Sequence, residues 1–153
     1  MYQAEVLKDI LLESGEIERY FDGNVPIDLW RAKKIKSSGP LFELVEREVA
    51  RSRGAPRKPD ITIENNWARI RDAPRGISTF DRPNIFKGHW AYYKIPAGTI
   101  LPIGLAIVKD HYNQSFGATH YTIAPAHDMP LSKFKVLLAE LAQLLEKDVA
   151  NGN

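Results

Sequence analysis

Residues 118–125 place hydroxyl groups, an imidazole and an aromatic ring within a run that otherwise alternates like a buried strand. Upstream, residues 76–81 hold a similar mixture: a glycine, a serine, a threonine, a phenylalanine and an aspartate. Burying such polar groups without hydrogen-bond partners costs roughly 1–3 kcal/mol each. Together the two stretches predict a site that binds a ligand.

Side chains alternate between the two faces of a strand, which divides the polar residues of 118–125 into two pairs. His120 shares one face with Thr122, and Thr119 shares the other with Tyr121. Either pair is therefore able to face the site. On residue type alone, a core histidine hydrogen-bonded to backbone is an equally good interpretation of His120.

Residue spacing argues against several other chemistries. No Walker loop, GxGxxG fingerprint or serine elbow occurs in the chain. Asp110 is the only carboxylate between residues 88 and 126, so a two-carboxylate glycosidase site would need distant residues. No metal is predicted, because close ligand pairings are absent among the four histidines, His89, His111, His120 and His127.

The pattern around these residues predicts one α+β domain with an antiparallel or mixed sheet flanked by helices. Apolar residues at helical spacing predict helices near 3–13, 17–21 and 41–49, and from about residue 130, with Asp128 as the cap of the last. Alternating or short apolar runs predict strands at 27–33, 61–64, 67–70, 77–81, 90–95, 105–109 and 119–123. We divide the domain, residues 1–153, into an N-terminal helical segment at 1–26 and a core at 27–150.

Composition is that of an ordinary globular protein, with 44% hydrophobic and 26% charged residues. The chain has no cysteine, no apolar run long enough to cross a bilayer and no signal-peptide pattern at its start, so we expect a cytoplasmic protein in the producing cell. Its net charge is only +2, but an acidic stretch at 1–30 precedes a basic one at 31–60. The basic stretch is either a solvated surface or a rim that attracts a phosphate-bearing ligand.

Five motifs carry a resemblance to a known family. The motifs are Gly76-x-Ser78-x-Phe80-Asp81, Ile95-Pro96-x-Gly98-Thr99, Ile100-Leu101-Pro102, Lys109-Asp110-x-Tyr112-Asn113 and Ala118-Thr119-His120-Tyr121-Thr122-Ile123-x-Pro125-Ala126. In order and spacing, they resemble the core of the small cytotoxic type VI secretion effectors that have an ADP-ribosyltransferase-like fold and are made beside an immunity protein. The resemblance covers residues 76 to about 138, with an anchor at 29–32.

The resemblance implies an NAD-dependent ADP-ribosyltransferase toxin. It implies that Arg31 meets a phosphate or ribose of NAD, and that Ser78 and Thr79 support the nicotinamide side. It further implies a cognate immunity protein, an intracellular target and delivery into a recipient cell without a signal peptide. The residues assigned to NAD are Arg31, Ser78, Thr79, Phe80, Tyr112 and Tyr121, and those assigned to catalysis are His120, Ser78 and Thr79.

The sequence departs from well-studied transferases, because the expected strand carries Thr119-His120-Tyr121 and no glutamate. The catalytic acid or base is therefore not named by the resemblance. Three alternatives stay open: an NAD glycohydrolase, a ribonuclease-type toxin that uses His120, Lys109 and His111, and a binding module without chemistry.

Overall fold

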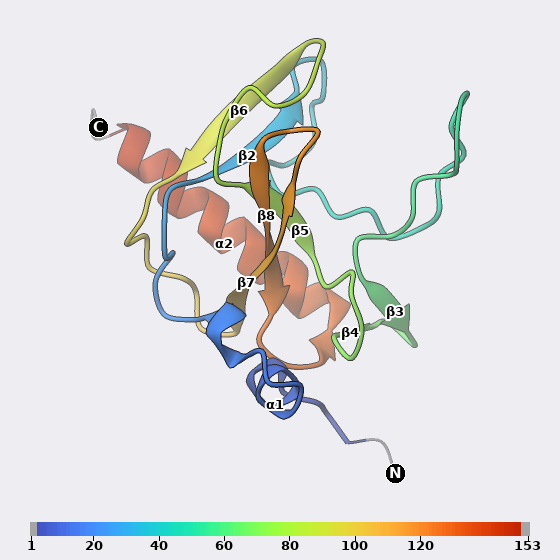
Figure 1. Cartoon of the computed structure of the whole chain (residues 1–153), viewed down its shortest axis with the longest axis vertical. Coiled ribbons are helices and arrows are strands. Elements are labelled where there is room, and N and C mark those ends of the chain that lie inside the picture. Colours follow the sequence, from blue (N-terminus) through green and yellow to red (C-terminus); the bar gives the residue numbers. More distant parts are fainter. Residues whose placement is uncertain (1–2, 151–153) are drawn as a thin grey trace.

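A six-stranded antiparallel sheet forms the centre of the computed structural model, which describes residues 3–150 (Figure 1). The strand order is β1-β7-β8-β5-β2-β6. A second sheet, in the order β3-β4-β9, packs at one end. The strands of the larger sheet are β1 (Tyr20–Phe21), β2 (Leu29–Lys34), β5 (Ile77–Phe80), β6 (Trp90–Ile95), β7 (Leu105–Asn113) and β8 (Ala118–Pro125), and those of the smaller one are β3 (Thr62–Glu64), β4 (Trp67–Arg69) and β9 (Met129–Pro130).

The long helix α2 (Leu131–Ala150) covers one face of the larger sheet, and the short helix α1 (Leu7–Glu13) lies below it (Figure 1). Phe134 and Leu141 of α2 are fully buried, as are Ile107 of β7 and Ile123 of β8. This apolar layer is the driving force for the fold. Because it fixes one face of β5, β7 and β8 inside, the polar residues Ser78, His120 and Thr122 lie on the opposite face.

The register between β5 and β8 decides which polar residues share that face. Ser78 lies opposite Thr122, and Phe80 lies opposite His120. The close approach of the two strands requires glycine at position 76, where a Cβ atom would come within 2.1 Å of the Ile123 carbonyl oxygen. The strands predicted at 77–81 and 119–123 are thus present, and the single α+β architecture is confirmed.

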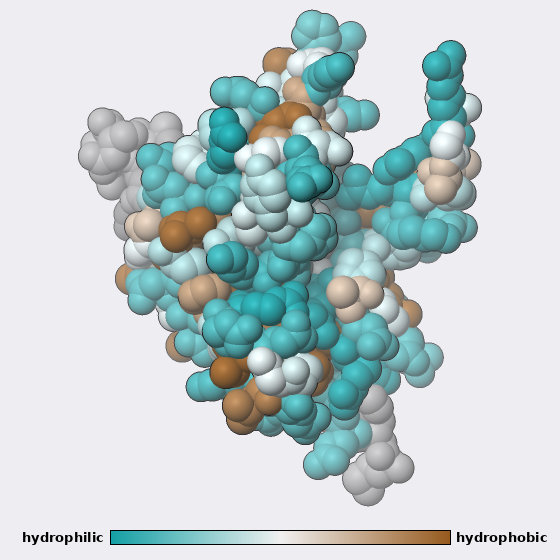
Figure 2. All heavy atoms as spheres, in the orientation of Figure 1, coloured by the Kyte–Doolittle hydropathy of each residue, from teal (hydrophilic) through white to brown (hydrophobic). Residues whose placement is uncertain are grey.

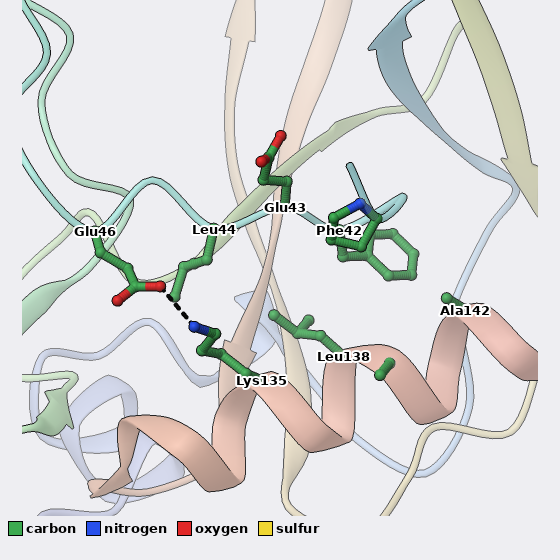
Figure 3. A pocket seen from close by; sticks show the side chains of 9 residues that line it. Phe42, Glu43, Leu44, Glu46, Lys135, Leu138 and Ala142 are labelled. Carbon is green, nitrogen blue, oxygen red and sulfur yellow. Dashed lines mark hydrogen bonds and ion pairs between the residues drawn. The ribbon is translucent and has the colours of Figure 1, made fainter. Parts of the chain in front are cut away.

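Two sequence predictions about helices are wrong. Residues 41–49 form no helix, because tertiary contacts occupy the backbone groups that a helix needs. The Arg31 side chain donates to the Leu41 and Glu43 carbonyls, and the backbone of Val45 bonds with Asp60 in both directions. The apolar side chains of this extended segment face α2 across a cavity of about 310 Å³, which the ion pair of Lys135 with Glu46 spans (Figure 3).

Asp128 is also not the cap of the last helix. Its two carboxylate oxygens accept the backbone N–H groups of Glu5 and Ile70, at 3.0 and 2.9 Å. Asp128 therefore ties the N-terminal segment to the strand end at residue 70. The N-terminal segment itself is less helical than predicted, since α1 begins only at Leu7 and residues 17–21 form a 3-10 turn, Ile17–Arg19, followed by β1. Residues 1–2 and 151–153 of the predicted domain lie outside the described residues.

Candidate functional site

A cavity of about 650 Å³ opens on the polar face of β5, β7 and β8. Its lining comes from the strands, from the N-terminal segment and from the turn at residues 73–76. Several of its side chains have polar groups that converge on one place, unlike the cavity beside α2, which is lined mainly by apolar groups. The polar residues that line it are Glu16, Arg19, Asp60, Ser78, Asp110, His111, His120 and Thr122.

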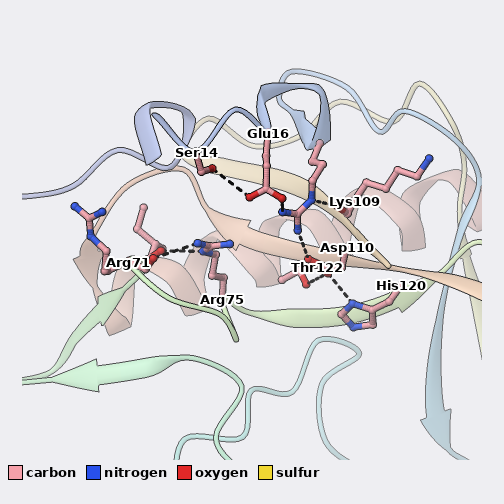
Figure 4. A network of polar contacts seen from close by, with 10 residues as sticks. Ser14, Glu16, Arg71, Arg75, Lys109, Asp110, His120 and Thr122 are labelled. Carbon is pink, nitrogen blue, oxygen red and sulfur yellow. Dashed lines mark hydrogen bonds and ion pairs between the residues drawn. The ribbon is translucent and has the colours of Figure 1, made fainter. Parts of the chain in front are cut away.

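Asp110 is the centre of this cluster (Figure 4). Its Oδ2 atom lies 2.6 Å from Nδ1 of His120 and accepts the hydroxyl of Thr122, also at 2.6 Å. Its Oδ1 atom accepts a guanidinium N–H of Arg19 at 3.2 Å. The face shared by His120 and Thr122, one of the two expected from the sequence, is therefore the face of the site.

A bulge in β7 brings Asp110 to this position. The register shifts between Lys109 and Tyr112, so Asp110 and His111 together lie opposite the single residue His120. Bulges of this kind redirect side chains near functional sites. As a result, both residues contact His120: Asp110 hydrogen-bonds with it, and the His111 ring stacks on the His120 ring at a centroid distance of 5.9 Å.

Electrostatics fix the protonation state of Asp110. Burial raises the pKa of this carboxyl group, but hydrogen bonds from His120 and Thr122 and the positive charge of Arg19 outweigh burial and leave the pKa below its usual value. Asp110 is thus ionised at neutral pH and can only accept hydrogen bonds. It follows that Nδ1 of His120 carries a proton, and that Nε2 is the nitrogen left to take one up.

The N-terminal segment completes the site. Nε of Arg19 donates to the Lys109 carbonyl at 2.7 Å, and its other nitrogens bond with Glu16 and Asp110. Arg19 thereby holds both the bulged backbone and the carboxylate. Glu16 and Arg19 come from the N-terminal segment that no motif matched, and both line the cavity.

Aromatic rings flank His120 on the side away from Asp110. Phe80 meets the imidazole edge to face at 5.1 Å and also contacts Phe86 and Phe116. Rings packed in this way contribute about 0.5–1.5 kcal/mol per pair beyond their buried area. The cluster gives His120 one dry side and one polar side.

The other predicted site residues lie elsewhere. Thr79 is 0% exposed, on the core face, and its hydroxyl donates to the Tyr121 carbonyl; burial, with Asp81 nearby, raises the pKa of the Tyr121 phenol. Tyr112 is 61% exposed and does not line the cavity. Arg31 is not paired with a carboxylate, since its guanidinium donates to backbone carbonyls of Leu41, Glu43 and Ser78.

Arg31 therefore supports the strand of Ser78 from outside the cavity. Burial also lowers the pKa of its guanidinium. Of the residues in the ribonuclease alternative, His111 and His120 are neighbours, but Lys109 lies opposite Tyr121 and its side chain is exposed. Across residues 3–150, no group of three or more histidine, aspartate or glutamate side chains is arranged to hold a metal ion.

Comparison with known proteins shows to which family the chain belongs. A sequence model described as the Tse2 ADP-ribosyltransferase toxin matches residues 9–149. The chain belongs to this family. Toxin Tse2 of Pseudomonas aeruginosa is 32% identical to it over 112 residues, which cover 71% of this chain and 70% of that protein.

Membership in the Tse2 family confirms the resemblance found in the motifs. The protein is a bacterial ADP-ribosyltransferase effector, and its family implies NAD as the substrate. The family does not favour a ribonuclease or a binding module. No helix among the described residues is long and apolar enough to span a membrane.

Sequence reasoning missed Asp110 and Arg19 as members of the site. The sequence contained a signal for Asp110, because it is the only carboxylate in the thirty-nine residues 88–126, which include the strand of His120. It contained none for Arg19, since Arg19 and Lys109 are 90 positions apart and are brought together only by the pairing of β1 with β7.

Proposed function

We propose that NAD binds in the cavity on the polar face of β5, β7 and β8, and that His120 and Asp110 act on it as a pair. The observation that carries the proposal is the Asp110 carboxylate, which accepts both the His120 imidazole and the Thr122 hydroxyl inside a cavity of about 650 Å³. That space is in the range of small-molecule and cofactor sites, roughly 300–1,000 Å³.

Transfer breaks the bond between the nicotinamide nitrogen and the ribose carbon, and nicotinamide leaves as a neutral molecule with the bonding electron pair. A nucleophile of the target then bonds to the ribose carbon and gives its proton to Nε2 of His120. Asp110 keeps that imidazole in the tautomer that can accept the proton and stabilises the imidazolium that results. Ser78 lines the same cavity and offers a hydroxyl to the amide of nicotinamide.

This arrangement offers a substitute for the glutamate that well-studied transferases carry on the strand of His120. Positive charge develops on the ribose during bond breaking, and a carboxylate near it is stabilising. Here the carboxylate comes from β7, the strand beside the expected one, and Asp110 is the residue that supplies it. Hydrolysis of NAD would use the same groups with water as the nucleophile.

We further infer that the protein is made with a cognate immunity protein and is delivered into the cytoplasm of a recipient cell, as its similarity to Toxin Tse2 suggests. The intracellular target is a molecule that carries the nucleophile. Co-production of the toxin with the neighbouring gene product should abolish toxicity and give a complex that purifies as one species.

Nicotinamide release from NAD, with cell lysate as the source of target, tests the proposed site. We expect His120→Ala to lower the rate by roughly a hundredfold or more, the usual contribution of a general base. His89→Ala is the matched control, because His89 is exposed and does not line the cavity. Equal rates for the two variants, with both folded, would place the reaction outside this cavity.

A further inference from the structure

A second group of charged side chains lies near Asp60 but outside the lining of the cavity. Residues 47–58 form an arm that extends away from the body of the protein, and every residue in it is exposed (Figures 1 and 2). Two backbone hydrogen bonds between Val49 and Arg57 close the arm at its base. Asp60 accepts Arg57 at 3.1 Å and the Val45 N–H at 2.7 Å, so the arm is anchored where the cavity begins.

The charge of the arm is positive and largely unpaired. It carries Arg47, Arg51, Arg53, Arg57 and Lys58 against the single acid Glu48, which pairs with Lys58. Among the side chains that the structure describes, those of residues 3–145, no carboxylate lies at ion-pair distance from Arg51 or Arg53. Exposed arginines that repel one another without a partner are unfavourable in the free protein, and an anionic partner would relieve this.

A groove continues this surface toward the end of the β2–β6 pair. It measures about 180 Å³ and is lined by Arg57 from the arm, by Lys33 and Lys34 from β2 and by Trp90 from β6. Glu43 is its one acidic residue. The Lys34 ammonium lies over the Trp90 ring, 5.6 Å from its centroid, so cation and aromatic surface are presented together.

We propose that the arm and this groove bind a single-stranded nucleic acid. Guanidinium groups bond phosphate oxygens in a planar fork, and an indole face is a platform on which a nucleobase can stack in place of the flexible lysine. An acidic protein fits less well, because the tip of the arm, residues 50–56, has no large apolar or aromatic side chain to serve as an anchor.

The binding site is distinct from the proposed NAD cavity and does not depend on it. Asp60 connects the two, since it lines the cavity and its carboxylate accepts the guanidinium of Arg57, which lines the groove. Arg31 also lines the groove, but its guanidinium is already bonded to carbonyls.

Fluorescence anisotropy of a short fluorescein-labelled oligouridylate, titrated with the full chain in the absence of NAD, tests the proposal. Single-strand binding loses about 0.7 in the slope of log affinity against log salt for each phosphate contact removed. We expect Arg51→Ala with Arg53→Ala to lower the affinity roughly tenfold at low salt and to reduce the slope by about 1.4. Arg51→Lys with Arg53→Lys should keep the slope.

The matched control is Lys8→Ala with Lys133→Ala, which removes the same charge from two exposed lysines on α1 and α2. Trp90→Ala should weaken binding about tenfold at every salt concentration without changing the slope, because stacking is not electrostatic. Equal losses in the arm variant and the control variant would overturn the proposal. So would the absence of binding at low salt, or equal binding of a polyglutamate competitor.

Discussion

The cavity and the basic arm with its groove both contain charged side chains, but they differ in whether those charges are buried and paired. In the cavity, Asp110 is partly buried and each of its oxygens has a bonded partner from His120, Thr122 or Arg19. In the arm, Arg51 and Arg53 are exposed and lie at ion-pair distance from no carboxylate among the described side chains of residues 3–145. Paired, desolvated charge fixes geometry and proton position, whereas exposed charge acts at a distance and is screened by salt.

Removing the charge of Asp110 should have the largest effect on the cavity. In Asp110→Asn the shape is kept, but the group that orients His120 is neutral, and the Arg19 guanidinium keeps only Glu16 as an ionic partner. We expect the rate of nicotinamide release to fall roughly a hundredfold, as a small displacement of a reacting group does. The same variant should leave binding of oligouridylate unchanged, and a loss of both properties would show that the two regions are not separate.

Substitutions of the neighbours Ser78 and Thr79 should separate the effect of losing a site residue from the effect of losing a core residue. Ser78→Ala should reduce nicotinamide release and leave the melting temperature unchanged, because its side chain lines the cavity. Thr79→Val should do the reverse and lower the free energy of unfolding by about 1 kcal/mol, since the buried hydrogen bond to the Tyr121 carbonyl is lost. Thermal unfolding and rate per folded molecule check both, and an inactive, fully stable Thr79→Val protein would contradict the assignment.

Stability as a function of pH reports on Asp110 separately from activity. Because its pKa is lower in the folded protein than its unperturbed value of 3.8, ionised Asp110 stabilises the fold above pH 3.8, and this contribution is lost as the pH falls through the folded value. The free energy of unfolding of the parent should therefore exceed that of Asp110→Asn at neutral pH. Urea titrations should show this difference shrinking toward acid, and a difference independent of pH would mean that folding leaves the pKa of this carboxyl group unchanged.

The smallest expected effect is that of the arm on NAD itself. Arg51→Ala with Arg53→Ala should leave nicotinamide release within about twofold of the parent when no nucleic acid is present, because these charges are exposed, do not line the cavity and are screened by salt. Steady-state rates measured at two salt concentrations check this. A large drop in rate would mean that the arm contacts NAD directly, and the two regions would then be one site.

Local sequence determined the strands of the site and their polar face. The alternation in 118–125 placed His120 and Thr122 on one face of a strand. These predictions succeeded because strand periodicity is a property of neighbouring residues. The same reasoning failed at 41–49, where helical spacing was overruled by Arg31 and Asp60, which bond with the backbone of that segment.

Motifs and residue periodicity were enough to predict the family, the α+β class and the strands that carry Ser78 and His120. The contacts of Asp110 with His120 and of Arg19 with Asp110, and the positions of Thr79 and Arg31 outside the cavity, emerge only from the folded chain. These contacts join residues far apart in the chain, through a β-bulge and a strand pairing. Periodicity assigns a side chain to a face, but the partner it meets there is set by the packing of the whole sheet.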